Sequence, residues 1–189
     1  MILSDQDIAR EIAAKHIQIS SFKKENIQPA SYDVTLYKQL RVLPASGTPI
    51  DVIHAVDYNT SQLIDIENSA FELSPGRSFI LAATAEYLAL PDNIAARIEG
   101  RSSLGRLGLI IHSTAGYVDP GWQGRLTLEV TNVGPSPLLL RAGMGIGQLS
   151  FVYLNTPAER PYGHKTRISR YQGDKGPEPS RFEQVLPTS

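Results

Sequence analysis

The spacing of apolar and polar positions takes three forms along the chain: it is helical at the start, strand-like over most of the length, and without period at the end. Ser4 is followed three positions later by Asp7, and Ile8 and Ile12 lie four positions apart. An acidic residue in the first turn bonds back to an N-cap serine, and apolar residues four apart share one helix face. These positions predict a short amphipathic helix over residues 5–15.

From Val34 to about residue 155 the chain consists of short apolar or alternating runs separated by Gly, Pro, Asn and Asp. Such runs with close turns are typical of antiparallel strands. We interpret as strands the runs at residues 34–37, 62–67, 78–84, 87–90, 125–132, 137–141 and 148–154. Within this region only residues 101–108 indicate a helix. The pattern predicts a mainly β fold, an antiparallel sandwich or barrel-like domain with a short N-terminal helix and one short internal helix.

The last stretch has a different composition from the rest. From residue 160 onward it contains four prolines and three glycines among many polar residues. Such a segment cannot supply its own core, and it is either disordered or a lid that orders on something else. We therefore divide the chain into a domain at residues 1–160 and a flexible tail at residues 161–189.

The charge balance narrows the classes of partner. The chain of 189 residues has 18 Lys and Arg against 19 Asp and Glu, a formal charge of −1. Binding to nucleic acids or anionic membranes scales with clustered positive charge, so we expect no nucleic-acid or membrane partner. No run approaches the roughly 20 apolar residues of a membrane span, and the acidic start does not fit a signal peptide. We expect a cytoplasmic protein.

Cysteine is absent from the chain, which excludes disulfides, iron–sulfur clusters, thiolate zinc sites and a cysteine nucleophile. The four histidines, His16, His54, His112 and His164, form no pair at metal-ligand spacing. We therefore do not expect a zinc hydrolase.

Residues 100–106, Gly-Arg-Ser-Ser-Leu-Gly-Arg, form the densest group of functional residue types. Amides at a helix start and serine hydroxyls donate hydrogen bonds to phosphate oxygens, and Arg101 and Arg106 add charge-assisted bonds. The stretch is a candidate triphosphate cradle, although it matches no Walker-type loop. Taken alone, such a stretch is more often a pair of N-cap serines beside two surface arginines.

A second candidate is the alternating strand at residues 125–131. Leu126, Leu128 and Val130 must face the core, so Glu129 lies on the opposite face with Thr127. A carboxylate there serves as a general base where a ligand or a neighbouring subunit covers that face. Without such cover it belongs to a solvated polar face.

A third candidate is the segment at residues 112–122, in which small residues flank Asp119. Small residues let a planar ring approach the backbone closely, and Tyr117 or Trp122 is available for stacking. The alternative is a glycine-rich turn with a structural aspartate, next to a packed core histidine at His112.

These stretches belong to an ordered series of blocks that resembles the dCTP deaminase family of the dUTPase-like superfamily. The blocks are residues 1–5, Gln28-Pro29 with Ser31 and Asp33, residues 90–93, 101–106, 112–121 and 127–129, Gly143, Gly147-Gln148 and Pro161-Tyr162. The resemblance implies a dUTPase-like fold and a homotrimer whose active sites are shared between subunits. It also implies deamination of dCTP at cytosine C4 without zinc, with Mg²⁺ bound through the triphosphate. The missing cysteines agree, because zinc deaminases need a P-C-x-x-C ligand pair.

The resemblance also carries residue roles to this chain. Glu129 corresponds to the general base, Ser102 and the main chain at Ala115 to the groups that hold the attacking water, and Arg106 to an arginine that acts across a subunit boundary. The segment at residues 127–129 corresponds to the strand that reads the pyrimidine. The implied substrate-binding set is Arg101, Ser102, Ser103, Leu104, Gly105, Arg106, Asp119, Thr127, Leu128, Glu129, Gln148, Tyr162, Arg170 and Asp174.

Within that set, Arg101, Ser102, Ser103 and Gln148 correspond to phosphate contacts, and Asp119 to the acceptor of the deoxyribose 3′-hydroxyl. Tyr162 and Arg170 resemble tail residues that close over the terminal phosphates. The family usually has Lys in place of Arg170 and Gln in place of Asp174. An acidic side chain near phosphates repels them unless Mg²⁺ intervenes.

Residues 115–119 bear on the product. Purely deaminating relatives typically carry Ala-His-Arg before Ile-Asp, whereas this chain has Ala-Gly-Tyr-Val-Asp. The pair Gly116 and Tyr117 resembles bifunctional enzymes that form dUMP, because a missing histidine side chain leaves room for a second water near the α-phosphate. The leading hypothesis is dCTP + 2 H₂O → dUMP + diphosphate + NH₃. The alternatives are a deaminase that stops at dUTP, a plain dUTPase acting on dUTP, and a silent nucleotide-binding regulator.

Overall fold

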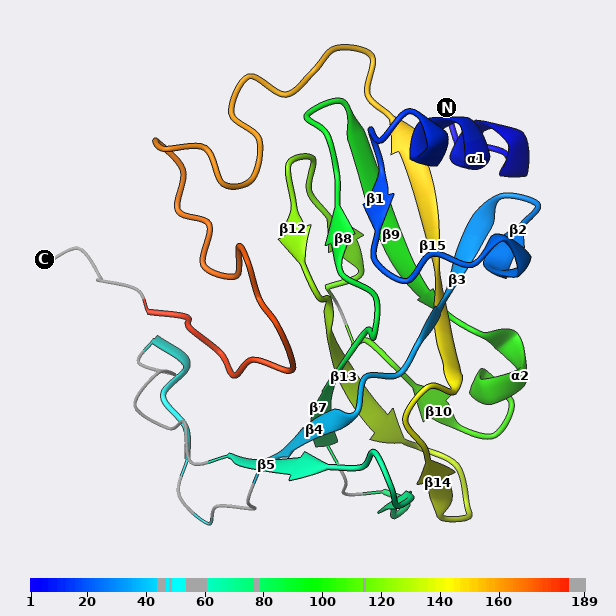
Figure 1. The fold of residues 1–189 in the computed structure, drawn as a ribbon. Coiled ribbons are helices and arrows are strands. Elements are labelled where there is room, and N and C mark those ends of the chain that lie inside the picture. Colours follow the sequence, from blue (N-terminus) through cyan, green and yellow to red (C-terminus); the bar gives the residue numbers. More distant parts are fainter. Residues whose placement is uncertain (44–46, 48, 54–60, 77–78, 114, 184–189) are drawn as a thin grey trace, which may run out of the picture.

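The computed structural model describes residues 1–43, 47, 49–53, 61–76, 79–113 and 115–183. Ser78 of one expected strand, Thr114 of the third candidate segment and residues 184–189 of the tail lie outside this part of the chain. Within it, short strands predominate, as the alternating runs predicted (Figure 1).

The expected N-terminal helix is confirmed as α1 (Asp5–Ala13). The Asp7 N–H donates to the Ser4 hydroxyl at 3.3 Å, and the Ser4 N–H donates to the Asp7 carboxylate at 3.2 Å. This reciprocal pair satisfies two free amides at the helix start and holds the pKa of Asp7 below its usual range. The helix ends two residues before the predicted boundary, because Lys15 adopts a left-handed backbone with φ of 60°.

One five-stranded antiparallel sheet has the order β11-β9-β15-β3-β2. Its strands are β2 (Ile27–Gln28), β3 (Ser31–Thr35), β9 (Ile94–Gly100), β11 (Tyr117–Val118) and β15 (Gly145–Tyr153), and a 3-10 turn, η1 (Lys24–Asn26), precedes β2. β15 pairs with β9 on one side and β3 on the other, so segments from three distant parts of the chain meet at its centre.

A second five-stranded antiparallel sheet has the order β10-β13-β7-β4-β5. Its strands are β4 (Gln39–Val42), β5 (Gln62–Asp65), β7 (Phe79–Ala83), β10 (Leu109–Ile110) and β13 (Thr127–Asn132). Two smaller sheets complete the described fold, one with β1 (Gln18–Ile19), β8 (Leu88–Ala89) and β12 (Gln123–Gly124), and the other with β6 (Phe71–Leu73) and β14 (Leu138–Leu140).

The hydrophobic core draws on both large sheets. Alternate residues of β13, Leu128 and Val130, are fully buried, as the period-2 pattern predicted, and Tyr32 and Phe151 are the largest fully buried side chains of the facing sheet. Burial of such side chains supplies most of the free energy that favours folding. The predicted mainly β class, with its short N-terminal and internal helices, is confirmed.

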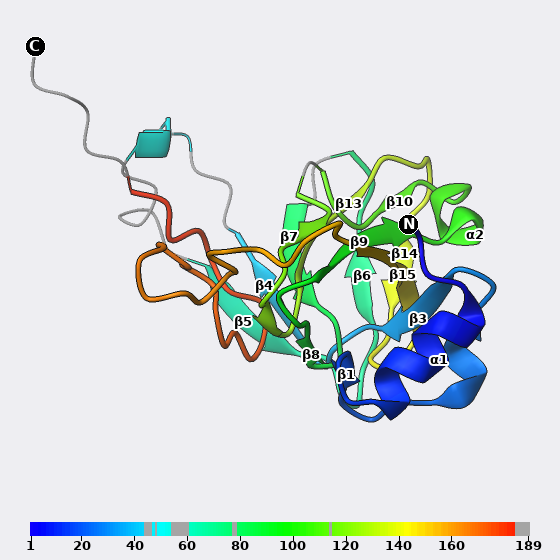
Figure 2. The same ribbon diagram turned by 90° about the horizontal axis from the view of Figure 1, so that it is seen from above.

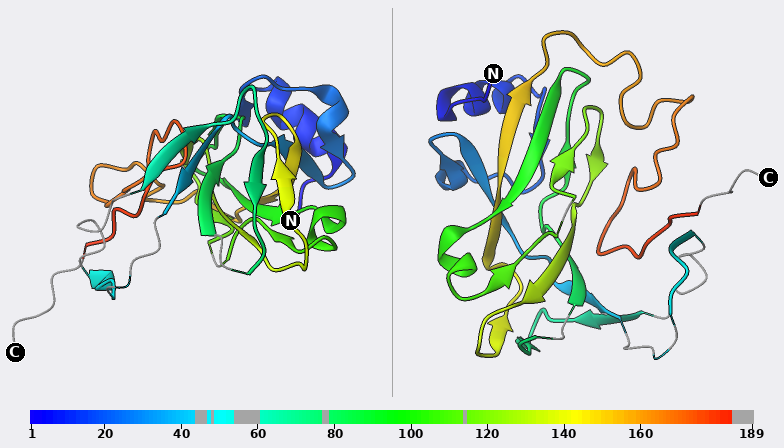
Figure 3. Two further views of the ribbon diagram at one scale, coloured as in Figure 1. Left: turned by 90° about the horizontal axis from the view of Figure 1, so that it is seen from below. Right: turned by 180° about the vertical axis from the view of Figure 1, so that it is seen from behind.

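The internal helix is α2 (Ser102–Gly105), which is shorter than the predicted span of residues 101–108. The segment ends at Gly108, whose φ of 92° and contact with the Gly134 backbone leave no space for a Cβ atom. The ribbon views place α2 and the tail on opposite sides of the molecule (Figures 2 and 3). Neither helix in the described part of the chain is long and apolar enough to cross a membrane.

Candidate active site

Two cavities contain most of the side chains that the sequence singled out. The first, of about 530 Å³, is lined by Ala115, Tyr117, Asp119, Thr127, Glu129, Tyr162 and Asp174 together with apolar side chains and tail residues 178–180. The second, of about 430 Å³, is lined by Gln28, Pro29, Ser31, Asp33, Gly100, Arg101, Ser102, Ser103 and Gln148. The candidate site is therefore in two parts, one with carboxylates and one with an arginine and serines.

Strand β13 brings Glu129 into the first cavity. Leu128 and Val130 are anchored in the core, so Glu129 and Thr127 point the other way and are half-buried. The Glu129 carboxylate accepts a hydrogen bond from the Ser113 N–H at 3.1 Å. This bond fixes one carboxylate oxygen and leaves the other available to a ligand in the cavity.

Asp119 follows β11 and enters the same cavity next to Glu129. Its carboxylate forms an ion pair with Arg167 of the tail at 3.2 Å, and both side chains are partly exposed. Because exposed ion pairs contribute little stability, a polar ligand can displace this contact at small cost.

Gly116 lies in a tight place between β9 and the ring of His112. Its carbonyl accepts the Ile98 N–H at 2.8 Å, and a Cβ atom at this position would lie 3.0 Å from the Ile98 oxygen and 3.2 Å from the His112 ring. A larger residue would have to push the ring or the strand aside. Glycine, which the sequence analysis singled out here, therefore fits at position 116 without displacing either neighbour.

The second cavity is built on the ends of three strands and the start of α2. Arg101, directly before α2, lies 3.5 Å from the Asp33 carboxylate of β3. Its guanidinium group also occupies the space where a Cβ atom of residue 145 would stand, so a larger residue at Gly145 would displace the end of the arginine side chain. The arrangement holds one cation beside the exposed hydroxyls of Ser102 and Ser103.

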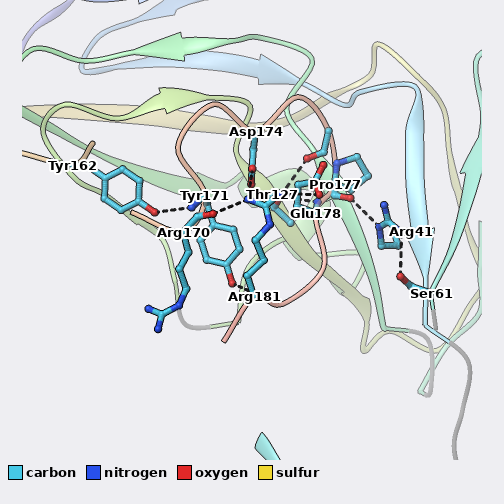
Figure 4. Close-up of polar contacts among 11 residues, drawn as sticks. Arg41, Ser61, Thr127, Tyr162, Arg170, Tyr171, Asp174, Pro177, Glu178 and Arg181 are labelled. Atoms are coloured by element: carbon cyan, nitrogen blue, oxygen red, sulfur yellow. Dashed lines mark hydrogen bonds and ion pairs between the residues drawn. The ribbon is translucent and has the colours of Figure 1, made fainter. Parts of the chain in front are cut away.

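The tail folds across the first cavity of its own chain (Figure 4). The Thr127 hydroxyl donates to the Gly176 carbonyl at 3.4 Å and accepts the Glu178 N–H at 3.3 Å. Arg41 of β4 donates to the Pro177 carbonyl at 3.0 Å. Farther back, the Gly173 N–H donates to the Gln123 carbonyl and the Arg125 N–H to the Asp174 carbonyl. Residues 161–183 are thus ordered on the domain without helix or strand.

Asp174 is 5% exposed and forms an ion pair with Arg181 at 3.0 Å. Burial raises the pKa of Asp174 to about 6, and the charge of Arg181 opposes this shift only in part. The Asp174 carboxylate thus pairs with Arg181 of its own tail and lines the first cavity. Arg101, Ser102 and Ser103 line the second cavity instead.

Tyr162 anchors the beginning of the tail. Its ring packs against Trp122 with centroids 5.3 Å apart, and its hydroxyl accepts the Tyr171 N–H at 3.0 Å. The backbone of Tyr162 passes so close to Gly121 that a Cβ atom there would lie 2.6 Å from the Tyr162 oxygen. The positive φ of Gly121, 84°, also favours glycine.

The remaining expected site residues lie outside the lining of both cavities as described. Leu128 points into the core, Leu104 packs against it, and Gly105 and Arg106 are exposed at the end of α2. Arg170 donates to the Glu183 carbonyl at 3.2 Å and stacks near the Phe182 ring, away from Tyr162 in Figure 4. The chain therefore gathers the expected residues on two sides and leaves Arg106 and Arg170 apart from both.

Ser31, Asp33 and Gln28 line the second cavity but were not assigned a role by the sequence. The Ser31 hydroxyl donates to the Gln148 side-chain oxygen at 3.1 Å, and Gln28 donates to Asp33 at 3.4 Å. Their signal is the alternation in β3, where Ser31, Asp33 and Thr35 interleave with the buried residues Tyr32 and Val34. The polar face of β3 lies beside β15, which contains Gly145 and Gly147. Polar side chains next to glycines, which leave space for a ligand, indicate a binding site.

The donor chemistry fits an anion better than a bare metal ion. No group of three or more His, Cys, Asp or Glu side chains gathers at metal-binding distance within the part of the chain that the structure describes. The second cavity offers guanidinium, hydroxyl and amide donors, and its one carboxylate, Asp33, is already opposite Arg101. Such a set suits phosphate oxygens, with any Mg²⁺ held by the phosphates themselves.

The described part of the chain is a mainly β protein whose antiparallel sheets carry a carboxylate cavity and an arginine–serine pocket, the two features expected of a nucleotide-binding enzyme. The chain belongs to the dCTP deaminase-like family, whose model matches residues 2–154. It is 48% identical over 182 residues to a Mycolicibacterium smegmatis protein named "dCTP deaminase, dUMP-forming", covering 96% of both chains. A Mycobacterium tuberculosis protein of the same name is 46% identical over 185 residues, covering 97% of both.

A solved structure supports the same fold. The chain resembles the crystal structure of 2′-deoxycytidine 5′-triphosphate deaminase from Agrobacterium tumefaciens with a TM-score of 0.65 and 25% identity. The match covers 81% of this chain and 48% of that one, so the chain spans about half the length of the solved relative.

Proposed function

We propose that this chain is a dUMP-forming dCTP deaminase, which converts dCTP and two waters into dUMP, diphosphate and ammonia. The observation that carries the proposal is Glu129, whose carboxylate is held by the Ser113 amide and faces a cavity of about 530 Å³, which is large enough for a small-molecule ligand. Near-full-length relatives with the name "dCTP deaminase, dUMP-forming" support the same reaction.

In the deamination step Glu129 takes a proton from a water as the water oxygen bonds to C4 of cytosine. Glu129 then delivers that proton to N3, takes the proton of the new hydroxyl group and passes it to the amino group. The C4–N bond breaks, ammonia leaves and the C4 carbonyl forms. General acid–base catalysis of this kind is worth about 100- to 10,000-fold in rate.

The Ser102 hydroxyl and the Ala115 carbonyl are the proposed partners of that water, and Arg106 orders the site. Ala115 lines the same cavity as Glu129, whereas Ser102 lines the second cavity. A single water needs all its partners within hydrogen-bond reach, about 2.6–3.2 Å. The proposed site is therefore completed by Ser102 and Arg106 of a neighbouring copy of the chain.

A homotrimer with shared sites is the assembly that we propose on this ground. Arg106 is exposed directly after α2, and α2 lies on the opposite side of the molecule from the tail (Figure 2). Heterologous contacts of this kind close into a ring when the rotation between copies is one third of a turn.

Phosphate release is the second chemical step of the proposal. A second water attacks the α-phosphorus, the bond to the β-phosphate oxygen breaks, and diphosphate leaves. The absence of a histidine side chain at Gly116 is the sequence feature that favours this step, and the Asp119 carboxylate, once Arg167 is displaced, is the group proposed to orient the water. A deaminase that stops at dUTP is the second candidate, since Tyr117 is 59% exposed and its final position in the assembly decides how much space remains.

The nucleotide phosphates lie against Arg101, Ser102, Ser103 and Gln148, with tail residues Tyr162, Arg170 and Asp174 closing the site in the proposal. Mg²⁺, when bound to the triphosphate, neutralises part of its charge. Zinc takes no part, because the chain lacks the cysteine pair of zinc deaminases. A cytoplasmic location stays a prediction from the sequence.

The test is incubation of the full chain with dCTP and Mg²⁺, followed by chromatographic separation of the nucleotides and an ammonia assay. We expect dUMP, diphosphate and ammonia in equal amounts, without transient dUTP. Accumulation of dUTP would support the second candidate. Unchanged dCTP with hydrolysis of added dUTP would identify a dUTPase, and no turnover of either nucleotide would identify a silent binding protein.

A further inference from the structure

Ser31 determines how the Gln148 amide faces the second cavity. The Ser31 hydroxyl donates to the Gln148 Oε1 atom at 3.1 Å, although 117 positions separate the two residues. Gln148 sits directly opposite Asp33 in the pairing of β15 with β3, and Ser31 lies two positions before Asp33 on the same strand. An amide whose oxygen is occupied by a hydroxyl donor presents its NH₂ group elsewhere.

The orientation matters because the two ends of an amide have opposite polarity. With Oε1 bound to Ser31, the Gln148 Nε2 atom is the end available to a ligand in the cavity. A reversed amide would place a carbonyl oxygen against phosphate oxygens, and two acceptors repel each other. In the structure the Ser31 hydroxyl thus holds the Gln148 side chain with its Nε2 atom as the end that a ligand can reach.

Asp33 plays the matching part for Arg101. Its carboxylate lies 3.5 Å from the guanidinium group and accepts a hydrogen bond from Gln28 at 3.4 Å. The guanidinium group also packs over Gly145, where a side chain would collide with it. Asp33 therefore draws one side of the Arg101 guanidinium group toward β3, and the remaining N–H groups can face the cavity.

We infer that Ser31 and Asp33 are positioning residues that hold Gln148 and Arg101 as a preorganised donor pair for the phosphates of the nucleotide. That the ligand is a nucleotide follows from the proposed function. The donor pair itself is inferred from two contacts of β3, Ser31 with Gln148 and Asp33 with Arg101. Preorganisation lowers the entropy lost on binding, so the pair acts on ligand affinity rather than on bond breaking.

Neither residue is needed for the core. Tyr32, Val34 and Leu36, which alternate with them, are fully buried and carry the packing of this strand. Ser31 is 9% exposed and its hydroxyl points at Gln148 rather than into the core. Removing the hydroxyl is expected to change nucleotide affinity with little change in the stability of the fold.

The first experiment compares Ser31→Ala, Ser31→Thr and a control, Thr35→Ala, in the steady-state conversion of dCTP. Thr35 lies on the same strand, and its hydroxyl donates to Glu86 at 2.8 Å, outside both cavities. We expect Ser31→Ala to raise KM about 5- to 10-fold, the effect of one lost hydrogen bond, and to change kcat by less than about twofold. Ser31→Thr keeps the hydroxyl and should restore KM.

The same variants are then combined with Gln148→Ala and Asp33→Asn. In the Gln148→Ala background, Ser31→Ala should have no further effect on KM, because the amide that it orients is gone. Asp33→Asn should raise KM for dCTP and leave the binding of deoxycytidine, which has no phosphates, unchanged.

Calorimetric titration of the full chain with inorganic tripolyphosphate and Mg²⁺ separates this inference from the proposed function. Weaker tripolyphosphate binding by Ser31→Ala supports the positioning role even if dCTP is not converted. Conversion of dCTP by Ser31→Ala with an unchanged KM overturns the positioning role and leaves the proposed function intact. An equal rise in KM for Thr35→Ala, or additive effects of Ser31→Ala and Gln148→Ala, would reduce Ser31 to a structural residue.

Discussion

The Glu129 carboxylate is held in the first cavity by its place on β13 and by a hydrogen bond from the Ser113 amide. The alternation in β13 predicted its face, because a one-residue shift would have buried the carboxylate and exposed Leu128 and Val130. Its hydrogen-bond partner, the Ser113 amide, lies 16 positions earlier, in an irregular turn where apolar and polar residues show no regular spacing. Contacts between a strand and an irregular turn depend on the path of the chain, which no local pattern encodes.

Replacement of that carboxylate tests its proposed role directly. Glu129→Gln should lower the rate of ammonia release from dCTP by at least about 100-fold, because the amide cannot accept the proton from water. The variant should still bind dCTP, as measured by calorimetry. Glu99→Gln is the matched control, since Glu99 is a partly exposed carboxylate on β9 outside both cavities. Normal ammonia release by Glu129→Gln would show that another group is the base.

Asp174 gives a pH dependence with a definite sign. Burial raises its pKa from 3.8 to about 6 in the packed tail. The packed tail therefore holds a proton that the open tail releases, so closure is most favourable below about pH 4 and weakens as pH rises through 6. Between pH 5 and 7 the closing equilibrium should fall about tenfold. The closing equilibrium is measured by hydrogen exchange at the amides of Gly173 and Arg125, after correction for the intrinsic pH dependence of exchange.

The control for that experiment is Asp174→Asn, which keeps the shape of the side chain and removes its titration. The tenfold change between pH 5 and 7 should disappear in this variant. An equal change in both proteins would assign the pH dependence to another group. The burial of Asp174 was outside the reach of sequence reasoning, which placed an exposed acid near phosphates, because it depends on how the tail turns over β12 and β13.

At the scale of elements, the periodicity of apolar residues and the helix cap predicted which elements form better than they predicted where each element begins and ends. The strands at residues 62–67, 87–90, 125–132 and 148–154 appear as β5, β8, β13 and β15, each with shifted ends. Strand β9 is not among the runs given above, because Ile94, Ala95 and Ala96 are all buried and show no alternation of apolar and polar positions. Ends of strands are set by bulges and by bonds to neighbours, such as the shift in register between Gly145 and Gly147.

The tail is the element whose removal is most informative. Deletion of residues 165–189 removes the segments that bond to Thr127 and Arg41 and that wall the first cavity. We expect kcat/KM for dCTP to fall by at least about 100-fold, because closed sites exclude water and complete the set of contacts. Deletion of residues 184–189 alone should retain turnover. Normal kinetics after the longer deletion would remove the tail from the proposed site.

At the scale of the whole molecule, the separation of the two cavities makes assembly part of the proposed chemistry. A mixture of two inactive variants tests this. Glu129→Gln and Arg106→Ala each disable one half of the site, so co-expressed chains that assemble at random should recover activity in about a quarter of the sites. The purified mixed oligomer is assayed for ammonia release from dCTP.

Each variant assayed alone is the control, and both should be inactive. If the two halves of a site belong to one chain, mixing cannot repair either defect, and the mixed oligomer will be as inactive as its parents. A single unassembled chain with full activity would also contradict sharing. Sequence reasoning reached the shared site only through family resemblance, because spacing along one chain carries no information about symmetry.

The contact between Trp122 and Tyr162 has a practical consequence. Trp122 is the only tryptophan in the chain, and it lies where the tail leaves the domain, with its ring against Tyr162. The protein therefore contains a single tryptophan fluorophore, which can be excited selectively, at the base of the segment that covers the first cavity. Its emission should report each opening and closing event in real time, on the unmodified protein and during turnover.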